Sequence, residues 1–342
     1  LSLAERLLQD LGRDLEEAAR ASERSEVYLN TRAEEVRILG PGRFEVALRS
    51  LDGAEPPQRI TASRVLLATG GNPQVPRAIG AMVTAACAER CPGNQPLMLT
   101  ADEFLHEQGR SAAEAWLENY ERPQVLVIGG AHSAFSSAWM LLERMQGEFE
   151  WRDGAVTLLH RSPIKVFYDS VEQARADGFA AFGDADIGGK GEVFPIGGLR
   201  GDAKALYRRV AGLGGAQPES RLRMRNLPAS GPEFAALDID WSQLALVVFA
   251  TGYIQPEVPV RNARGAPIAL QGQYTDRYVD QRCRVLDVLG NPLPGLYAAG
   301  FTSGFSPVEM LSGEASYDGK ENSVWLCQHM LGEALFDALV KV

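Results

Sequence analysis

The chain has 342 residues, of which 45% are hydrophobic and 23% are charged, so it is long enough for two globular domains of ordinary composition. Its formal net charge of -10 argues against nucleic-acid binding, which needs a basic face. No apolar run approaches the roughly 18 residues of a membrane span, and we therefore expect no membrane association.

The four cysteines of the chain are scattered, at Cys87, Cys91, Cys283 and Cys327. None of them forms a C-x-x-C pair, so we expect neither a redox dithiol nor a metal site, and we interpret them as small buried thiols. The N-terminal stretch lacks the basic-then-apolar pattern of a signal peptide. Together these features favour a cytoplasmic protein.

The first part of the chain combines one helix with several strands. Leu7, Leu11 and Leu15 lie on one face of a predicted helix over residues 3–21. Short strands are predicted at residues 26–30, 34–39, 43–48 and 60–69. Residues 78–122 then predict a mixture of helix and loop.

The apolar run at residues 125–128 predicts a buried strand. It turns at Gly129 and Gly130 and leads into a helix that should begin near Ser133. A second strand at residues 156–160 completes a βαβ unit of the size used for dinucleotide binding. The unpaired backbone N–H groups at the start of such a helix bind a pyrophosphate.

The glycine turn matches the pattern G-x-G-x-x-G/A with one departure. Gly129 takes the first position and Ala134 an allowed last position, but Ala131 replaces the middle glycine. We expect the methyl group of Ala131 to hold a pyrophosphate slightly further away. Ser133 either binds the pyrophosphate or caps the helix, and His132 is either a phosphate neighbour or a surface histidine.

The end of the second strand indicates which nicotinamide cofactor is preferred. NAD-binding proteins place an acidic residue there for the ribose 2′-hydroxyl, whereas this chain has Arg161 directly after His160. An arginine can bind a 2′-phosphate through two hydrogen bonds. The sequence therefore favours NADPH, and the alternative is a solvated arginine at a strand end.

The remainder of the chain is less regular. Many glycines interrupt the region after Arg161, followed by a predicted helix at residues 202–210 and a strand at 221–225. Further strands are predicted at residues 244–251 and 296–299, and helices follow to the end.

Three segments share a pattern around the βαβ unit. VLLATGG at residues 65–71 and VVFATGY at residues 247–253 are apolar strands that end in Ala-Thr-Gly, and GLYAAG occupies residues 295–300. Their order resembles that of flavoproteins with two dinucleotide-binding domains, namely the flavin-containing and N-hydroxylating monooxygenases and the thioredoxin-reductase-like enzymes.

The resemblance implies an α/β fold in which a Rossmann-like NADPH-binding domain, residues 79–250, is inserted into an incomplete FAD-binding domain made of residues 1–78 and 251–342. The two Ala-Thr-Gly segments would be the crossovers between the domains, and the last strand would end near the flavin. The cofactor-binding residues implied in this way are Ala68, Thr69, Gly70, Ala250, Thr251, Gly252, Gly300, Phe301 and Pro307.

Two departures from the family concern the flavin. The family opens with its own strand–GxGxxG–helix for FAD, which this sequence lacks; we expect this motif to be cleaved off, supplied by another chain or fragment, or lost. Phe301 stands where much of the family has aspartate. Pro307 follows Ser306 in a capping box, and this helix start either faces the flavin ring or is only a well-made helix start.

The predicted function is that of an NADPH-dependent flavoprotein oxidoreductase. The Ala-Thr-Gly-Tyr form at residues 250–253 favours a monooxygenase that hydroxylates a small nitrogen- or sulfur-containing substrate. The alternatives are a quinone, ferredoxin or disulfide-type reductase without C-x-x-C and a non-catalytic NADPH-binding subunit. No residue can be singled out as catalytic, since much of the chemistry belongs to the cofactor.

Overall fold

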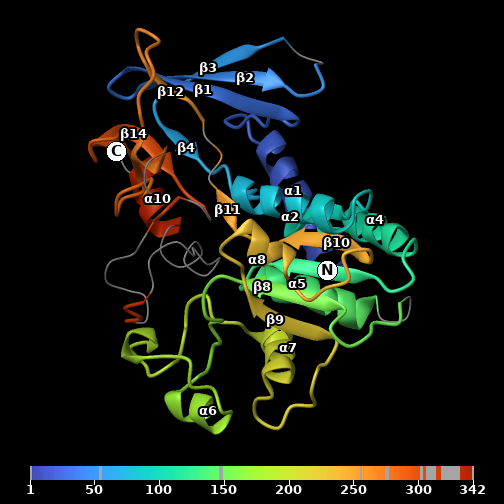
Figure 1. Cartoon of the computed structure of the whole chain (residues 1–342). Coiled ribbons are helices and arrows are strands. Elements are labelled where there is room, and N and C mark those ends of the chain that lie inside the picture. Colours follow the sequence, from blue (N-terminus) through green and yellow to red (C-terminus); the bar gives the residue numbers. More distant parts are fainter. Residues whose placement is uncertain are drawn as a thin grey trace.

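The computed structural model of the chain describes residues 2–53, 56–145, 149–254, 256, 258–273, 277–300, 303–305, 313–316 and 332–340. Within these residues, a five-stranded parallel sheet of order β6-β10-β7-β8-β9 forms the lower half of the molecule (Figure 1). Its strands are β6 (Leu97–Thr100), β7 (Gln124–Ile128), β8 (Val156–His160), β9 (Leu222–Asn226) and β10 (Leu244–Phe249).

Both faces of this sheet are covered, which explains the continuous apolar runs in its central strands. Val125 and Val127 belong to the apolar core on one face, whereas Leu126 and Ile128 belong to the core on the other face. The first core includes residues of α3 (Ala101–Leu105), α4 (Glu107–Leu117), α5 (His132–Trp139) and α7 (Gly201–Ala211). The second core includes residues of α2 (Arg77–Arg90) and α8 (Gly231–Ala235).

Three short helical segments complete this half of the molecule. They are a π-helical turn at Met140–Arg144, α6 (Val171–Ala176) and a 3₁₀ turn at Asp184–Asp186. The α/β fold class with a Rossmann-like sheet, predicted from the sequence, is confirmed.

The two ends of the chain together build the upper half (Figure 1). A four-stranded sheet has the order β12-β1-β2-β3 and a three-stranded sheet has the order β13-β14-β4. Phe44 of the first sheet and Leu67, Leu296 and Ala298 of the second belong to one apolar core. The elements of this half are α1 (Ser2–Ala21), β1 (Thr31–Gly40), β2 (Arg43–Ser50), β3 (Gln58–Ala62), β4 (Val65–Leu67), β12 (Val260–Asn262), a 3₁₀ turn at Gln271–Gln273, β13 (Arg284–Leu286), β14 (Pro292–Ala298) and α10 (Gly332–Val340).

A two-stranded ribbon lies where the chain passes between the two halves (Figure 1). It consists of β5 (Asn72–Pro73) and β11 (Tyr253–Ile254), which pair antiparallel. The Thr251 hydroxyl donates a hydrogen bond to the Gln74 carbonyl, and the Gln74 N–H donates to the Gly252 carbonyl over 3.0 Å. We call β5, β11 and these flanking residues the crossover ribbon.

Two of the predicted strands need correction, and one strand was missed. Residues 26–30 form no strand, because Val27 and Leu29 are exposed and Asn30 turns the chain with a φ of 51° before β1 begins. The predicted strand at residues 60–69 is two strands, since β3 pairs with β2 whereas β4 pairs with β14 in the other sheet. The sequence analysis also missed β6, a short edge strand whose Met98 is 38% exposed.

Candidate cofactor-binding site

The glycine turn after β7 lies between the ends of two neighbouring strands. Gly129 has a φ of 151°, and a Cβ atom at this position would lie 2.2 Å from the carbonyl oxygen of Ala250, which follows β10. A Cβ atom on Gly130 would lie 3.0 Å from the Cβ atom of His160, at the end of β8. Close packing therefore requires glycine at position 129 and leaves little space at position 130, and the turn is held between β8 and β10. We call residues 129–134 together with Arg161 the dinucleotide corner.

The helix that follows this turn begins without a side-chain cap. Ala131 is the N-cap of α5 and His132 its first helical residue. The N–H groups of the first turn of a helix have no acceptor within the helix, and they carry the positive end of its dipole. The corner thus presents backbone donors at the carboxyl edge of the parallel sheet, where dinucleotide pyrophosphates bind in this architecture.

Arg161 lies at the end of β8, beside the glycine turn. Its side chain is exposed, and within the described part of the chain it forms no ion pair. Many other arginines of this acidic protein are paired with a carboxylate, for example Arg208 with Asp177. An exposed arginine at this strand end can bind a phosphate group.

His132 connects the dinucleotide corner to a second helix start. The backbone N–H of Arg200, the N-cap of α7, donates to His132 Nε2 over 3.2 Å. The guanidinium group of Arg200 lies 3.9 Å from the centre of the Phe167 ring. Burial and the positive charge of Arg200 both lower the pKa of His132. In this hydrogen bond the imidazole nitrogen is the acceptor.

Tyr253 of the crossover ribbon contacts the helix that follows β6. Its hydroxyl donates to a carboxylate oxygen of Asp102 in α3. Burial and the hydrogen bond to Asp102 raise the pKa of Tyr253 to about 12. Ser133 lies in the first turn of α5 and does not cap this helix, since the N-cap is Ala131.

Asp102, Arg200 and Tyr253 were not predicted as site residues. Tyr253 was noted only as the end of an Ala-Thr-Gly-Tyr pattern. For Asp102 a local signal existed, because Thr100 and Glu103 form a capping box that marks a helix start after a strand. Nothing in the sequence indicated that Arg200 would lie beside His132.

A second junction lies at the carboxyl ends of β4 and β14, which are parallel neighbours. Ala68, Thr69 and Gly70 follow β4 and are exposed, and the Ala299 N–H donates to the Leu67 carbonyl over 3.0 Å. Gly300 has a φ of 116°, and its Cβ position is 4.0 Å from the Gly70 nitrogen. We call residues 68–70 and 300 the glycine junction. The structure therefore brings two of the predicted segments together here.

Ser303 follows the glycine junction and carries an unusual hydroxyl. The residue is 1% exposed, and its Oγ has no hydrogen-bond partner within the described residues. A buried hydroxyl without a partner costs about 1–3 kcal/mol, so such an atom indicates a place where a ligand can supply one. The predicted site residues Phe301 and Pro307 lie outside the described residues.

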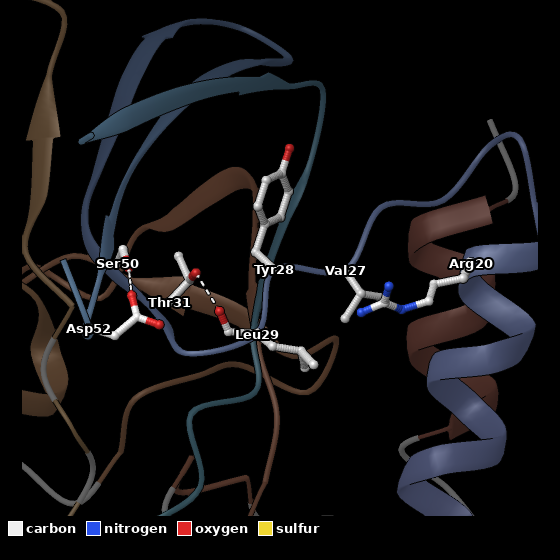
Figure 2. Close-up of a pocket in the computed structure, with 7 residues that line it drawn as sticks. All are labelled: Arg20, Val27, Tyr28, Leu29, Thr31, Ser50 and Asp52. Carbon is white, nitrogen blue, oxygen red and sulfur yellow. Dashed lines mark hydrogen bonds between the residues drawn. The ribbon is translucent and has the colours of Figure 1, made fainter. Parts of the chain in front are cut away.

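An open pocket of about 240 Å³ lies elsewhere, between α1 and the start of β1 (Figure 2). It is lined by Arg20 and by residues of the segments 27–31 and 50–52. The Ser50 hydroxyl donates to Asp52 and the Thr31 hydroxyl to the Leu29 carbonyl over 2.9 Å (Figure 2). Neither the dinucleotide corner nor the glycine junction contributes a residue to this pocket.

Metal-binding clusters, membrane-crossing helices and cysteines can be assessed in the same part of the chain. Among the described residues there is no cluster of histidine, cysteine and acidic side chains suited to a metal ion. None of the described helices has the length and apolar character needed to cross a membrane. Cys87 and Cys283 are buried thiols, as predicted, whereas Cys91 is only half-buried; Cys327 lies outside the described residues.

A comparison with curated proteins finds one that matches almost the whole chain. CMP-5′-(3-aminopropyl)phosphonate hydroxylase from Streptomyces rubellomurinus is 31% identical over 345 residues, which cover 96% of this chain and 73% of that protein. The chain belongs to the family of this hydroxylase. The prediction of an oxidoreductase of the monooxygenase type is thereby confirmed, although the chain matches no family model.

Two solved structures are similar to the chain, at lower sequence identity than this hydroxylase. L-lysine 6-monooxygenase from Pseudomonas syringae has a TM-score of 0.46 and 16% identity, covering 90% of this chain and 70% of that chain. Ornithine hydroxylase from Pseudomonas aeruginosa has a TM-score of 0.47 and 15% identity, covering 97% of this chain and 76% of that chain.

Proposed function

We propose that this member of the hydroxylase family binds NADPH at the dinucleotide corner and FAD at the glycine junction, and that it hydroxylates an amine nitrogen. Residues 79–250 would form the NADPH-binding domain, and residues 1–78 and 251–342 would contribute to the FAD-binding domain. The observation that carries the proposal is the arrangement of two strand-edge junctions, each lined by glycines, joined by one crossover ribbon.

The residues at each junction fit the group assigned to it. At the dinucleotide corner, Gly129 leaves no room for a Cβ atom and Gly130 leaves little, and neither residue has a side chain to obstruct an approaching pyrophosphate. At the glycine junction, the buried Ser303 hydroxyl lacks a partner, and Gly70 and Gly300 lie close together. This hydroxyl can donate to an oxygen of a flavin side chain.

Individual residues have distinct roles in this proposal. The N–H groups at the start of α5 would bind the pyrophosphate, and Arg161 would bind the 2′-phosphate of NADPH through paired hydrogen bonds. Neutral His132 fixes the start of α5 against the N-cap of α7. When bound, the flavin supplies the redox chemistry by accepting a hydride and using O2 for hydroxylation.

The proposed substrate is a small molecule with a primary amine. The relative from Streptomyces rubellomurinus is named for a substrate that carries an aminopropyl group on a phosphonate linked to CMP. We infer an aminoalkyl phosphonate, free or linked to a nucleotide, as the first substrate class to test for this chain.

We also infer that a glycine-rich strand–turn–helix outside these 342 residues binds the ADP half of FAD. Neither the glycine junction nor the dinucleotide corner contains a second strand–turn–helix that could bind the ADP half of FAD. The matched relative is longer than the match, since 73% of its length is covered. That segment would belong to the same polypeptide or to a partner chain.

The visible spectrum and the reaction product test this function together. Protein purified with its native partners should show flavin bands at about 370 and 450 nm and should add one oxygen to an aminoalkyl phosphonate when NADPH is supplied. The added oxygen can be located on nitrogen by tandem mass spectrometry. A preparation that binds NADPH but stays colourless after FAD is added would instead favour a non-catalytic subunit.

A further inference from the structure

A short piece of the chain that follows the glycine junction lies against the lower half of the molecule. We call residues 313–316 the docked segment. The Ser316 N–H donates to the Ala185 carbonyl over 2.7 Å, and the Cβ position of Gly313 lies 3.2 Å from the Gly189 nitrogen. The docked segment therefore contacts the long connection between β8 and α7, which belongs to the other half of the chain.

Glu314 makes the central contact of the docked segment through a buried carboxylate. The residue is 5% exposed, and its two oxygens accept the Ile196 N–H over 2.9 Å and the Ser316 hydroxyl over 3.2 Å. Ile196 is itself 8% exposed, and within the described residues its N–H has no other acceptor. A buried N–H group without an acceptor is unfavourable, so Glu314 stabilises the backbone at Ile196.

The backbone around Ile196 forms a tight turn, residues 194–198, which we call the Ile196 turn. Phe194 is buried and has a φ of 44°, in the left-handed region that non-glycine residues rarely adopt. A Cβ atom on Gly198 would lie 2.5 Å from the Phe194 carbonyl oxygen. A strained turn of this kind keeps its shape only while its surroundings hold it, and Glu314 is one of those contacts.

Arg200 connects the Ile196 turn to the dinucleotide corner. Its guanidinium group donates to two carbonyls of the turn, those of Pro195 and Gly198. Its backbone N–H donates to His132 Nε2 over 3.2 Å, at the start of α5. A continuous path of hydrogen bonds and backbone therefore leads from Glu314 to the helix start that presents its N–H groups to a pyrophosphate.

We propose that Glu314 is a positioning residue that fastens the docked segment to the Ile196 turn and thereby fixes Arg200 against His132 at the NADPH site. This inference rests on the proposed NADPH site. It adds that the affinity of the dinucleotide corner for NADPH depends on a carboxylate from the part of the chain assigned to FAD binding.

Hydrogen–deuterium exchange of the full chain tests the contact itself, in peptides that cover residues 194–200. Glu314→Ala leaves the Ile196 N–H without its acceptor, so exchange in these peptides should rise about five- to tenfold. Glu314→Gln keeps an amide oxygen that can accept the same bond, and it should restore most of the protection. This measurement needs no cofactor.

Calorimetric titration with NADPH tests the effect of the contact on the dinucleotide corner. Glu314→Ala should raise the dissociation constant of NADPH about three- to tenfold, because the partner of His132 is no longer held in place. Glu314→Gln should stay within about twofold of the wild type. Rescue by glutamine shows that the hydrogen bond, and not the charge of Glu314, positions the turn.

Glu233→Ala is the matched control. The Glu233 carboxylate also accepts a backbone N–H, that of Ala229 over 3.1 Å, but it belongs to α8, which packs on the other face of the parallel sheet from α5. The variant removes the same charge and a bond of the same kind. It should leave the exchange of residues 194–200 and the affinity for NADPH unchanged.

Several results would overturn the inference. It fails if Glu314→Ala leaves the exchange of residues 194–200 unchanged, if NADPH affinity stays at the wild-type value while exchange rises, or if Glu233→Ala has equal effects. If Glu314→Ala does not fold, Gly313→Ala takes its place, because a methyl group 3.2 Å from the Gly189 nitrogen must shift the docked segment. Unchanged exchange in that variant counts against the inference.

The two measurements separate this inference from the proposed function. A wild-type chain that binds no NADPH rejects the proposed function and the coupling to it. Raised exchange in Glu314→Ala would still support the contact between Glu314 and the Ile196 turn.

Discussion

At the scale of single residues, Arg161 carries the choice between NADPH and NADH. Its guanidinium group is exposed at the end of β8, where the ribose of a bound dinucleotide lies in Rossmann-like folds. We predict that Arg161→Ala weakens NADPH binding roughly tenfold or more, because charge-assisted hydrogen bonds contribute about 1.5–3 kcal/mol. NADH lacks the 2′-phosphate, so its affinity should change little.

Arg264→Ala provides the control for this measurement. Arg264 is also exposed, but it lies in the turn after β12, in the upper half of the molecule. It should leave the affinities for both nucleotides unchanged. Equal weakening of NADPH and NADH binding by Arg161→Ala would contradict the proposal that this residue binds the 2′-phosphate.

Ser303 gives a prediction in which stability and affinity change in opposite directions. Removing a buried hydroxyl that has no partner relieves its desolvation cost, so Ser303→Ala should keep or slightly raise the melting temperature of the flavin-free protein. If the hydroxyl bonds to FAD, the same variant should raise the dissociation constant of FAD several-fold. Flavin fluorescence titration and thermal unfolding measure the two effects, and unchanged FAD affinity would contradict the role given to Ser303.

His132 should make stability depend on pH. Its folded-state pKa is lowered from the ordinary 6.5 by burial and by Arg200, so the unfolded chain binds more protons than the folded chain between the two pKa values. The contribution of His132 to stability is therefore complete above pH 6.5 and is lost as the pH falls through that window. Protonation would also remove the acceptor for the Arg200 N–H.

The variant His132→Gln tests this sign. Glutamine keeps an acceptor oxygen and does not titrate, so the fall in melting temperature between about pH 8 and about pH 5 should be smaller in the variant than in the wild type. An identical fall in both proteins would show that His132 does not contribute.

At the scale of elements, the glycine turn between β7 and α5 is the tightest constraint on the dinucleotide corner. In Gly129→Ala the new Cβ atom would lie 2.2 Å from the Ala250 carbonyl oxygen and the residue would keep a φ of 151°. We predict that the variant loses about 2–4 kcal/mol of unfolding free energy, or does not fold. Gly231→Ala is the control, since nothing lies within 4 Å of its Cβ position and it begins α8; its effect should be within about 0.5 kcal/mol. Chemical denaturation measures the unfolding free energy of both variants. Equal values for Gly129→Ala and Gly231→Ala would contradict the close packing at Gly129.

The same corner shows what a sequence can predict. An apolar run followed by two glycines and a helix start is a local pattern, and it predicted β7, the turn and α5 to within one or two residues. The second strand was also local, and β8 has the bounds that were predicted. The order of the crossovers around this unit predicted the fold class.

The errors and omissions concern contacts between distant parts of the chain. Residues 60–69 contain no glycine or proline that would mark a break, and it is their pairing with β2 and β14 that divides them between two sheets. The short strand β6 has too few residues to show a period. The bond between Tyr253 and Asp102 joins residues that are 151 positions apart, which no local pattern can indicate.

At the scale of the whole molecule, the crossover ribbon lies where the chain passes between its two halves (Figure 1). The parallel sheet of the lower half presents the dinucleotide corner, and the sheet of β4 and β14 presents the glycine junction. Membership of a hydroxylase family favours an oxygen-using enzyme over the reductase alternative. If the two cofactors bind as proposed, NADPH at the first site must reduce a flavin at the second.

Anaerobic reduction of the bound flavin tests this requirement most directly. Protein purified with its native partners and saturated with FAD is mixed with NADPH or NADH without oxygen, and the absorbance at about 450 nm is followed. We predict that NADPH bleaches the flavin band at least about tenfold faster than NADH at equal subsaturating concentrations, and that Arg161→Ala removes this preference. A bound flavin that NADPH does not reduce, or that both nucleotides reduce equally, would contradict the account.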